Sequence, residues 1–335
     1  MFSRNISVNA SVVASFDDLI AYHIVNACLG SACLMINVLL LFIFLSYPPF
    51  RRKYVLLILL CIGDSINSLA TVLTGLNRIY LYSTAMRTLT LPVRNSLECA
   101  SELWLIIKLI GDLLIPVCTF WMGVERFTAI MFPIFYRLSV DGKAVKFVFI
   151  PGISCIFVAV SMVIAFSIAA NSDRPVHFYC GRKAAFGENF GTFIYLCNIV
   201  CNLASSILNG AAYLRARQLC KIQCRMQRQV AIIRYYLLIS LLSTLLVSLP
   251  NAIALFQLYV QRVGDSVSKP ASWLQTTNSG LHFFCYLILN REFRQRALIQ
   301  LKLREPQEHS YSKCAQMWVY KKVCGDVKMR ETEKI

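Results

Sequence analysis

Charged residues are scarce in this 335-residue chain. Asp, Glu, Lys and Arg make up 15% of it, whereas a typical soluble domain contains about 25%. Apolar residues make up 57% and aromatic residues 12%, so the chain also lacks the polar composition of a disordered protein. Acidic residues are the scarcer sign, with 17 against 34 Lys and Arg, which gives a net charge of +17. These proportions exclude an ordinary soluble enzyme and indicate an integral membrane protein.

The side chains that build most catalytic sites are also few. The four His are scattered along the chain, at His23, His177, His282 and His309. The sequence shows no cluster of metal ligands, no Ser-His-Asp set and no Gly-rich phosphate-binding loop. We therefore expect neither an enzyme nor a bound metal or cofactor.

Long apolar runs fill most of the chain. A membrane-spanning helix needs about 20 mostly apolar residues. Five runs without a charged residue reach this length, namely 19–50, 147–172, 189–214, 235–261 and 270–290. Two more contain ionisable residues: 54–77, with Asp64, and 103–124, with Lys108 and Asp112. The sequence predicts an all-α membrane protein, a seven-transmembrane helix bundle.

The basic residues indicate the orientation of these spans. With the N-terminus outside, 24 of the 34 Lys and Arg fall on the cytoplasmic side, eleven of them after residue 290. Basic residues near span ends remain in the cytoplasm, so we expect a multi-pass plasma-membrane protein without a cleaved signal peptide. The predicted segments are an extracellular N-terminus 1–18, the transmembrane domain 19–290, an amphipathic juxtamembrane helix 291–303 and a cytoplasmic tail 304–335.

The predicted outer side carries two kinds of modification signal. Asn5 and Asn9 begin N-glycosylation sequons in the extracellular segment. Most of the 14 Cys lie in apolar runs, but Cys99 and Cys180 fall clearly outside, in an oxidising compartment. We expect these two to form a disulfide that holds the second outer loop against the third span, with two free thiols as the alternative.

Two cysteines of the predicted tail, Cys314 and Cys324, lie on the cytoplasmic side. A palmitoyl group can be attached to a Cys near the membrane. Both residues lie far beyond the amphipathic helix, so the sequence leaves modified and free thiols equally open.

A charged group inside the bilayer is costly unless it is paired or solvated, so each one is a functional candidate. Asp64 lies midway along the second span, within reach of Asn37, Asn278 and Ser279 if their helices pack together. This polar core is able to hold a small hydrated cation such as sodium. It can equally serve only to hydrogen-bond the helices together, and the sequence leaves both interpretations open.

Lys108 and Asp112 stand four residues apart, so they share a helix face and can form an ion pair. If the pair faces an outer cavity, it is a candidate ligand contact, and Lys108 favours acids or neutral acceptors over amines. If not, the two groups simply neutralise each other. Asn251, beside Pro250 in the sixth span, is a further candidate for the ligand pocket.

An acid and a base are adjacent at the inner end of the third span. Glu125 and Arg126 are followed by Phe127 and, farther on, by Pro133. They form either a local salt bridge or a switch, in which Arg126 leaves the acid to contact a partner on the cytoplasmic side.

Taken in chain order, these residues resemble the rhodopsin-like G-protein-coupled receptors over residues 19–303. Glu125-Arg126-Phe127 corresponds to the DRY motif of that superfamily, and Asn278-Ser279 with Tyr286 corresponds to its NPxxY region. The other matching positions are Asn37, Leu60, Asp64, Cys99, Pro133, Cys180, Tyr213 and Pro250. The resemblance implies a ligand site between helices three, five, six and seven, and a helix-six kink at Pro250. It also implies an inner face where Arg126, Tyr213 and Tyr286 meet a heterotrimeric G protein.

The chain departs from that superfamily at several positions. His282 and Phe283 replace the usual Asn and Pro before Tyr286, and Ser248 replaces a Trp. Near the start of helix six, Val230 and Arg234 supply no acid to oppose Arg126, so no ionic lock between helices three and six is expected. This mixture is similar to the nematode serpentine chemosensory receptors of the srsx class, which implies a chemosensory role and a location in sensory cilia.

The alternative function is a seven-helix transporter or ion channel that uses Lys108, Asp112 and Asp64. Residues 113–117 below Asp112 are apolar and offer no continuous polar path. The expected partners are a heterotrimeric G protein, a small-molecule or peptide ligand and anionic membrane lipids, because the basic residues gather on the inner side. We expect no nucleic-acid partner.

Overall fold

The computed structural model describes residues 4–7, 16–140, 148–172, 175–176, 180–220, 227–260 and 265–301. The chain divides into two units, residues 1–291 and 292–335. In the second unit the described part is residues 292–301, most of helix α13 (Arg291–Gln300). All other described helices and strands belong to the first unit.

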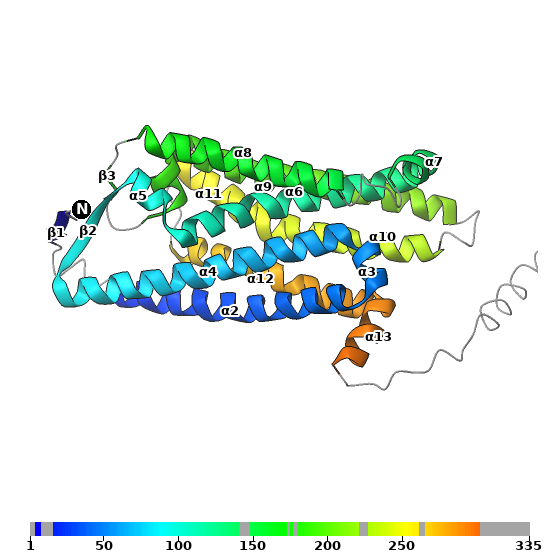
Figure 1. Ribbon diagram of the computed structural model, residues 1–335, viewed down its shortest axis with the longest axis horizontal. Coiled ribbons are helices and arrows are strands. Elements are labelled where there is room, and N and C mark those ends of the chain that lie inside the picture. Colours follow the sequence, from blue (N-terminus) through cyan, green and yellow to red (C-terminus); the bar gives the residue numbers. More distant parts are fainter. Residues whose placement is uncertain are drawn as a thin grey trace, which may run out of the picture. The chain divides into compact units, whose positions relative to one another are not determined.

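Long helices run side by side in the first unit (Figure 1). Six helical stretches of the described residues are long and apolar enough to cross a membrane: α2 (Phe16–Ser46), α4 (Val55–Thr88), α6 (Leu103–Met131), α8 (Ile150–Ala170), α9 (Arg182–Cys220) and Ile233–Tyr259. The last stretch is formed by α10 (Gln227–Ser243), the π-helical turn η4 (Thr244–Ser248) and α11 (Leu249–Tyr259). A further helix, α12 (Asp265–Leu289), packs along α2.

Several helices are longer than the apolar runs that predict them. α4 continues from the bilayer run to Thr88 and ends where Leu89 adopts a left-handed conformation with φ of 51°. Such a residue breaks the helical hydrogen-bond ladder. α9 starts at Arg182, before the predicted span, but Gly187 has φ of 81° and interrupts the helical backbone. Arg182 therefore sits on a short segment that precedes the long part of α9.

Short elements close the two ends of the bundle. One end carries an antiparallel sheet in the order β1 (Arg4–Ser7), β2 (Thr90–Asn95) and β3 (Pro175–Val176), where Asn5 pairs with Pro92 and Arg94 with Val176. Helix α5 (Ser96–Ala100) follows β2. The other end carries α3 (Pro48–Lys53), α7 (Pro133–Phe135) and the π-helical turn η1 (Tyr136–Val140). Pro starts both α3 and α7, the position where its missing N–H is harmless.

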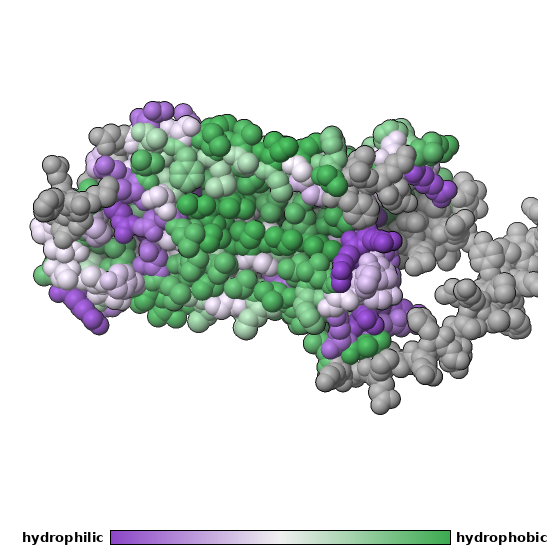
Figure 2. Space-filling view, viewed as in Figure 1, coloured by the Kyte–Doolittle hydropathy of each residue, from purple (hydrophilic) through white to green (hydrophobic). Residues whose placement is uncertain are grey.

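The packing of the bundle is that of a multi-pass membrane protein. Figure 2 shows hydrophobic side chains across the middle of the visible face and hydrophilic ones toward both ends. Met35 and Ile207 are 68% and 70% exposed, whereas Asn37 and Asn202 are fully buried. Large apolar side chains thus face outward, where a bilayer would cover them, and polar ones lie inside.

Hydrogen bonds from small polar side chains join α6 to α9 within the bundle. Ser205 Oγ donates to the Thr119 carbonyl at 2.7 Å, and Asn198 Nδ2 donates to the Asp112 carbonyl at 3.0 Å. Polar side chains connect helices in this way inside membranes. The Asn198 bond holds the Asp112 turn of α6 against α9.

Candidate functional site

A cavity of about 480 Å³ opens among five helices near the end that carries the sheet. Its lining includes Tyr22 from α2, Arg78 from α4, Lys108 from α6, Arg182 from α9 and Gln275 from α12. Most ligand pockets have volumes of about 300–1,000 Å³. The cavity therefore has room for a small organic molecule.

Two cations share one carboxylate at this cavity. Lys108 Nζ lies 3.5 Å from Asp112 Oδ1, and Arg182 Nη1 lies 2.5 Å from Asp112 Oδ2. The Lys108 ammonium also donates to Asn67 Oδ1 at 2.6 Å. The Asp112 side chain is fully buried, while those of Lys108 and Arg182 are each 20% exposed. The sequence anticipates the Lys108–Asp112 pair, but Arg182 makes it a triad.

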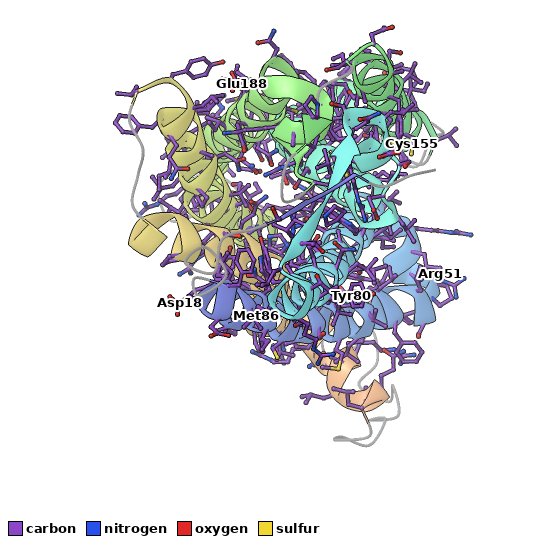
Figure 3. All side chains as sticks on the ribbon, turned by 90° about the vertical axis from the view of Figure 1, so that its left-hand side faces the viewer. Asp18, Arg51, Tyr80, Met86, Cys155 and Glu188 are labelled. Atoms are coloured by element: carbon purple, nitrogen blue, oxygen red, sulfur yellow. A yellow bond between two sulfur atoms is a disulfide. The ribbon has the colours of Figure 1, made fainter. Side chains whose placement is uncertain are left out.

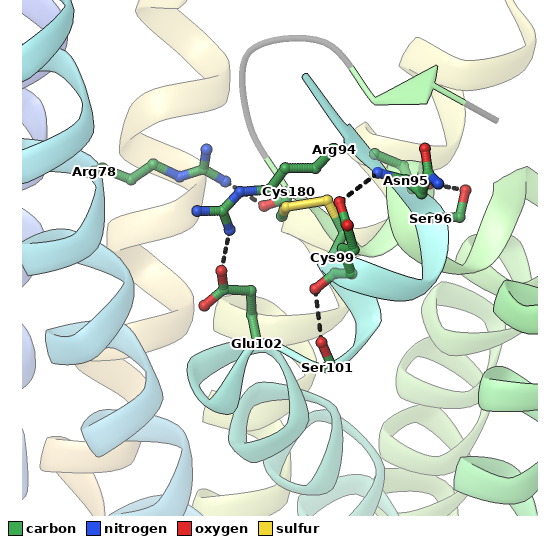
Figure 4. The surroundings of a disulfide bond; sticks show 10 residues. Arg78, Arg94, Asn95, Ser96, Cys99, Ser101, Glu102 and Cys180 are labelled. Carbon is green, nitrogen blue, oxygen red and sulfur yellow. Dashed lines mark hydrogen bonds and ion pairs between the residues drawn. A yellow bond between two sulfur atoms is a disulfide. The ribbon is translucent and has the colours of Figure 1, made fainter. Parts of the chain in front are cut away.

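A disulfide between Cys99 and Cys180 joins α5 to the residues just before α9 at this end (Figure 4). Because Cys180 comes two residues before Arg182, the covalent link brings the start of α9 to the top of α6. Arg78 donates to the Cys180 carbonyl, and its guanidinium lies 5.3 Å from the ring centroid of Trp104. The pairing of Cys99 with Cys180 is the one expected from their shared position outside the membrane.

Asn251 does not line this cavity. Its side chain is 2% exposed, and Nδ2 donates to the Val247 carbonyl one turn earlier in the same helical stretch at 2.7 Å. The hydrogen bond spans the junction between η4 and α11. In this structure Asn251 therefore closes a turn of helix six.

In the polar core Asp64 contacts His282, whereas the sequence suggests Asn37, Asn278 and Ser279 as its neighbours. Asp64 Oδ2 lies 2.8 Å from His282 Nδ1, and His282 Nε2 lies 3.4 Å from Ser243 Oγ. Asn278 Nδ2 donates to the same Ser243 Oγ at 3.3 Å. This chain of contacts runs from α4 through α12 to α10.

The other two polar residues expected at Asp64 lie beside this chain. Ser279 Oγ lies 3.2 Å from Ser68 Oγ, a second link between α12 and α4. Asn37 is fully buried in α2, and its side-chain amide has no hydrogen-bond partner within the described part of the chain. The hydrogen-bond partner of Asp64 among the described residues is thus His282.

A cluster of aromatic and charged side chains surrounds Arg126 near the C-terminal end of α6. Arg126 Nη2 donates to Glu125 Oε2 at 3.2 Å and to the Tyr236 hydroxyl at 3.0 Å. The guanidinium also lies 4.2 Å from the centroid of the Tyr236 ring, a cation–π distance. Tyr136 in η1 donates to Glu125 Oε1 at 2.9 Å. The cluster joins α6 to α10 and to η1.

The other residues that the sequence predicts on the cytoplasmic side have the following surroundings. Phe127 packs against Phe132, with ring centroids 6.5 Å apart, and Pro133 begins α7. Tyr213 packs on a cluster of buried apolar residues that joins α6, α9 and α10. Tyr286 is buried, and its ring contacts those of Phe44 and Tyr235.

A family model matches residues 31–300 of this chain, and it describes the serpentine type 7TM GPCR chemoreceptor Srsx. The chain belongs to the Srsx family. The match covers the Arg126 cluster and most of the bundle, and it starts within α2, after the cavity-lining residue Tyr22. Among curated proteins, none matches the chain. Srsx proteins are chemoreceptors rather than enzymes, and the similarity to srsx receptors that the sequence motifs indicate is thereby confirmed.

Sequence reasoning missed three residues of these Srsx sites, and each left a signal. His282 stands out as a departure from the NPxxY region, one turn after Asn278. Tyr236 comes two residues after Arg234, just after the stretch in which no acid is present to oppose Arg126. Arg182 is the first basic residue after Cys180, so a disulfide from Cys180 to the residues before helix three brings it toward the start of that helix.

Some expected features of this Srsx chain lie outside the described residues. They are the Asn9 sequon, Cys314, Cys324 and the tail 304–335. Asn5 lies in β1, of which the backbone pairing is described.

Proposed function

We propose that this Srsx chain is a chemosensory receptor of the plasma membrane that binds a small ligand from outside and activates a heterotrimeric G protein inside. The observation that carries the proposal is the Arg126–Tyr236 contact between α6 and α10, at the end of the bundle opposite the sheet and the outer cavity. A contact between two helices at one end can respond to a ligand bound between helices at the other end, if one helix moves as a unit.

The proposed topology has seven spans, with α12 as the seventh, the N-terminus outside and the C-terminus inside. The bias of basic residues supports it. Glycosylation at Asn5 and Asn9 tests it: Asn5→Gln and Asn9→Gln should each remove one glycan, seen as a mobility shift that a glycosidase abolishes. Arg291, Arg294 and Arg296 on α13 suit an amphipathic helix that lies on the anionic inner leaflet.

The moving element is proposed to be helix six, formed by α10, η4 and α11. Pro250 begins its outer part, immediately after the π-helical turn Thr244–Ser248. Pro and π-helical turns both weaken the regular helical hydrogen-bond ladder. A ligand that binds the active conformation better than the inactive one shifts the population toward the active one. Swinging the inner part of helix six outward separates Tyr236 from Arg126.

That movement exposes a cytoplasmic cleft between the helices. We expect Arg126, Tyr213 and Tyr286 to line it, with Phe127 and Pro133 at its edge, and the G-protein α-subunit to dock there. The polar core of Asp64, His282, Ser243 and Asn278 connects α4, α10 and α12 in the closed state, rather than holding a sodium ion. The transporter or channel alternative has no support from the family match, and the residues directly below Asp112 are buried and apolar.

Second-messenger assays test the proposal in cells that express the chain, challenged with a panel of odorants. We expect a response to a subset of odorants, and its loss in Arg126→Ala at equal surface expression. Blocking the responsible G-protein class should abolish the response as well. A response that survives both Arg126→Ala and blockade of every G-protein class would overturn the proposal. A tagged receptor in sensory neurons should concentrate in cilia.

A further inference from the structure

The outer cavity carries an excess of positive charge. Lys108 and Arg182 both contact Asp112, so one carboxylate balances two cations. All three side chains are largely or fully buried, and a buried charge without a counterion is unfavourable. The triad of Lys108, Asp112 and Arg182 therefore carries one positive charge in excess, and Arg78, which also lines the cavity, adds a further cation.

The acids at this end whose side chains the structure describes do not balance that charge. Glu98 accepts a hydrogen bond from the Asn95 N–H at the start of α5, and Glu102 pairs with Arg94. The acids that are exposed are Asp17, Asp18 and Glu188. Figure 3 looks at this end of the bundle and places the labelled Asp18 and Glu188 at its periphery.

Both cations have donors left for a further partner. An ammonium has three N–H donors, and a guanidinium has five. Among the described residues, Lys108 donates to Asn67 and lies beside Asp112, while Arg182 bonds to Asp112 and stacks over Tyr195 at 5.3 Å. An anion in the cavity can therefore reach unused donors on two side chains without displacing Asp112.

Aromatic side chains also line the cavity. Tyr22 and Tyr82 line it, the Tyr22 ring lies 5.7 Å from that of Trp273, and the Tyr82 ring lies 5.8 Å from that of His23. Such rings bury flat apolar groups well. The lining of the cavity thus combines cationic and aromatic side chains.

We propose that the ligand of this receptor is a small organic acid, with a carboxylate between Lys108 and Arg182 and an apolar, preferably aromatic, body against Tyr22 and Tyr82. The proposal rests on the function proposed above, since it takes the outer cavity as the ligand site. A carboxylate completes the charge balance of the triad, whereas an amine adds a third cation beside Asp112.

The test measures thermal stabilisation of the purified receptor in nanodiscs of zwitterionic lipid, a medium without anionic headgroups that compete. The probes are 3-phenylpropionate, its amide and the corresponding amine, which share a ring and differ in charge. Binding to the folded state raises the unfolding temperature by an amount that grows with the logarithm of the ratio of ligand concentration to Kd. We expect the acid to stabilise the receptor and to bind at least about tenfold more tightly than the amide, because one hydrogen bond to a charged group contributes about that much. The amine should have no effect.

Two variants locate the effect. Arg182→Gln leaves Lys108 to balance Asp112, and Lys108→Met leaves Arg182, so each variant keeps a neutral pair while removing the excess charge. Both should lose most of the preference for the acid over the amide. Lys183→Gln is the matched control, because Lys183 carries the same charge one residue away and does not line the cavity. It should keep the preference.

Three results would overturn the proposal: equal stabilisation by acid and amide, an acid preference that persists in both Arg182→Gln and Lys108→Met, or no stabilisation by the acid at millimolar concentration. None of them bears on G-protein coupling, which is judged by the cellular response and its dependence on Arg126. If the receptor responds to neutral odorants and the response is the same in Lys108→Met as in the parent, the proposed function stands and the proposal of an anionic ligand is wrong.

Discussion

The guanidinium of Arg126 lies on the face of the Tyr236 ring, 4.2 Å from its centroid, and also donates to the hydroxyl of that residue at 3.0 Å. One tyrosine thus makes two contacts with the same cation. A cation–π contact and a hydrogen bond are each weaker than a desolvated ion pair. A helix-three to helix-six connection of this kind should open at a smaller energetic cost than an acid–base lock.

Removing the Tyr236 hydroxyl should raise signalling in the absence of ligand. Tyr236→Phe keeps the ring and loses a hydrogen bond of about 1 kcal/mol, which shifts a two-state equilibrium by about fivefold. Tyr236→Ala loses both contacts and should raise basal second-messenger levels further. Tyr235→Phe is the control, since its hydroxyl has no hydrogen-bond partner among the described residues. Basal signalling that is equal in the parent and in all three variants would show that the Arg126–Tyr236 contact does not hold the receptor in its inactive state.

Replacing His282 should create a sodium dependence that the parent chain lacks. His282 Nδ1 lies 2.8 Å from one oxygen of Asp64 and occupies the position in which a cation would otherwise bind. In His282→Asn, the Asp64 carboxylate and nearby amide oxygens become available to a hard cation, which prefers oxygen ligands. We expect a higher unfolding temperature in sodium chloride than in potassium chloride for the variant, and no difference for the parent. An equal sodium effect in both proteins would show that the core binds the ion despite His282.

A methyl group at Gly111 should separate α4 from α6. A Cβ there would lie 2.9 Å from the Asn67 Cβ and 3.0 Å from its Cα, and Asn67 is the residue that accepts from Lys108. Overpacking of this kind costs about 1–3 kcal/mol, so Gly111→Ala should lower the thermal stability of the purified receptor. Gly152→Ala in α8 is the control, because a Cβ there meets nothing within 4 Å. A Gly111→Ala receptor as stable as the control would mean that the two helices adjust freely.

Loss of either bridged cysteine should have the same effect as loss of both. Removing a native disulfide costs about 2–5 kcal/mol, so Cys99→Ser and Cys180→Ser should each reduce surface expression and unfolding temperature. The double variant should be no worse than the single ones. Cys155→Ser, at an exposed position on α8 labelled in Figure 3, should behave like the parent. Additive losses in the double variant would indicate two independent roles instead of one bond.

Because the protein lies in a membrane, part of its structure can be predicted from the sequence. A helix that crosses hydrocarbon must be apolar over its length, so seven spans are visible as runs, and a charge such as Asp64 or Lys108 stands out inside them. Six of these runs correspond to described helical stretches that are long and apolar enough to cross a membrane. The pairing of these charges is not visible, because it depends on how each helix is rotated about its axis. Packing sets that rotation, which is why His282 rather than Asn37 meets Asp64.

Helix ends are harder to predict than helices. Helical residues outside the hydrocarbon core need not be apolar. The composition therefore does not indicate that α4 continues to Thr88 or that α9 begins at Arg182. Gly187 is the one local mark of the break in α9, but a single glycine in an otherwise helical stretch is weak evidence. By sequence alone, Arg182 therefore counts among the outer loop charges and not among the residues of the ligand site.

The π-helical turn Thr244–Ser248 also affects how related receptors are compared. A π-helical turn accommodates one residue more than an α-helical turn, and one residue corresponds to about 100° of rotation in a helix of 3.6 residues per turn. A relative without that turn presents a different residue to Arg126 at the same distance from Pro250. An alignment of helix six without a gap between Pro250 and Tyr236 would then match Tyr236 to a residue on another face of the helix. Deleting one residue of the turn should reproduce that mismatch within this chain.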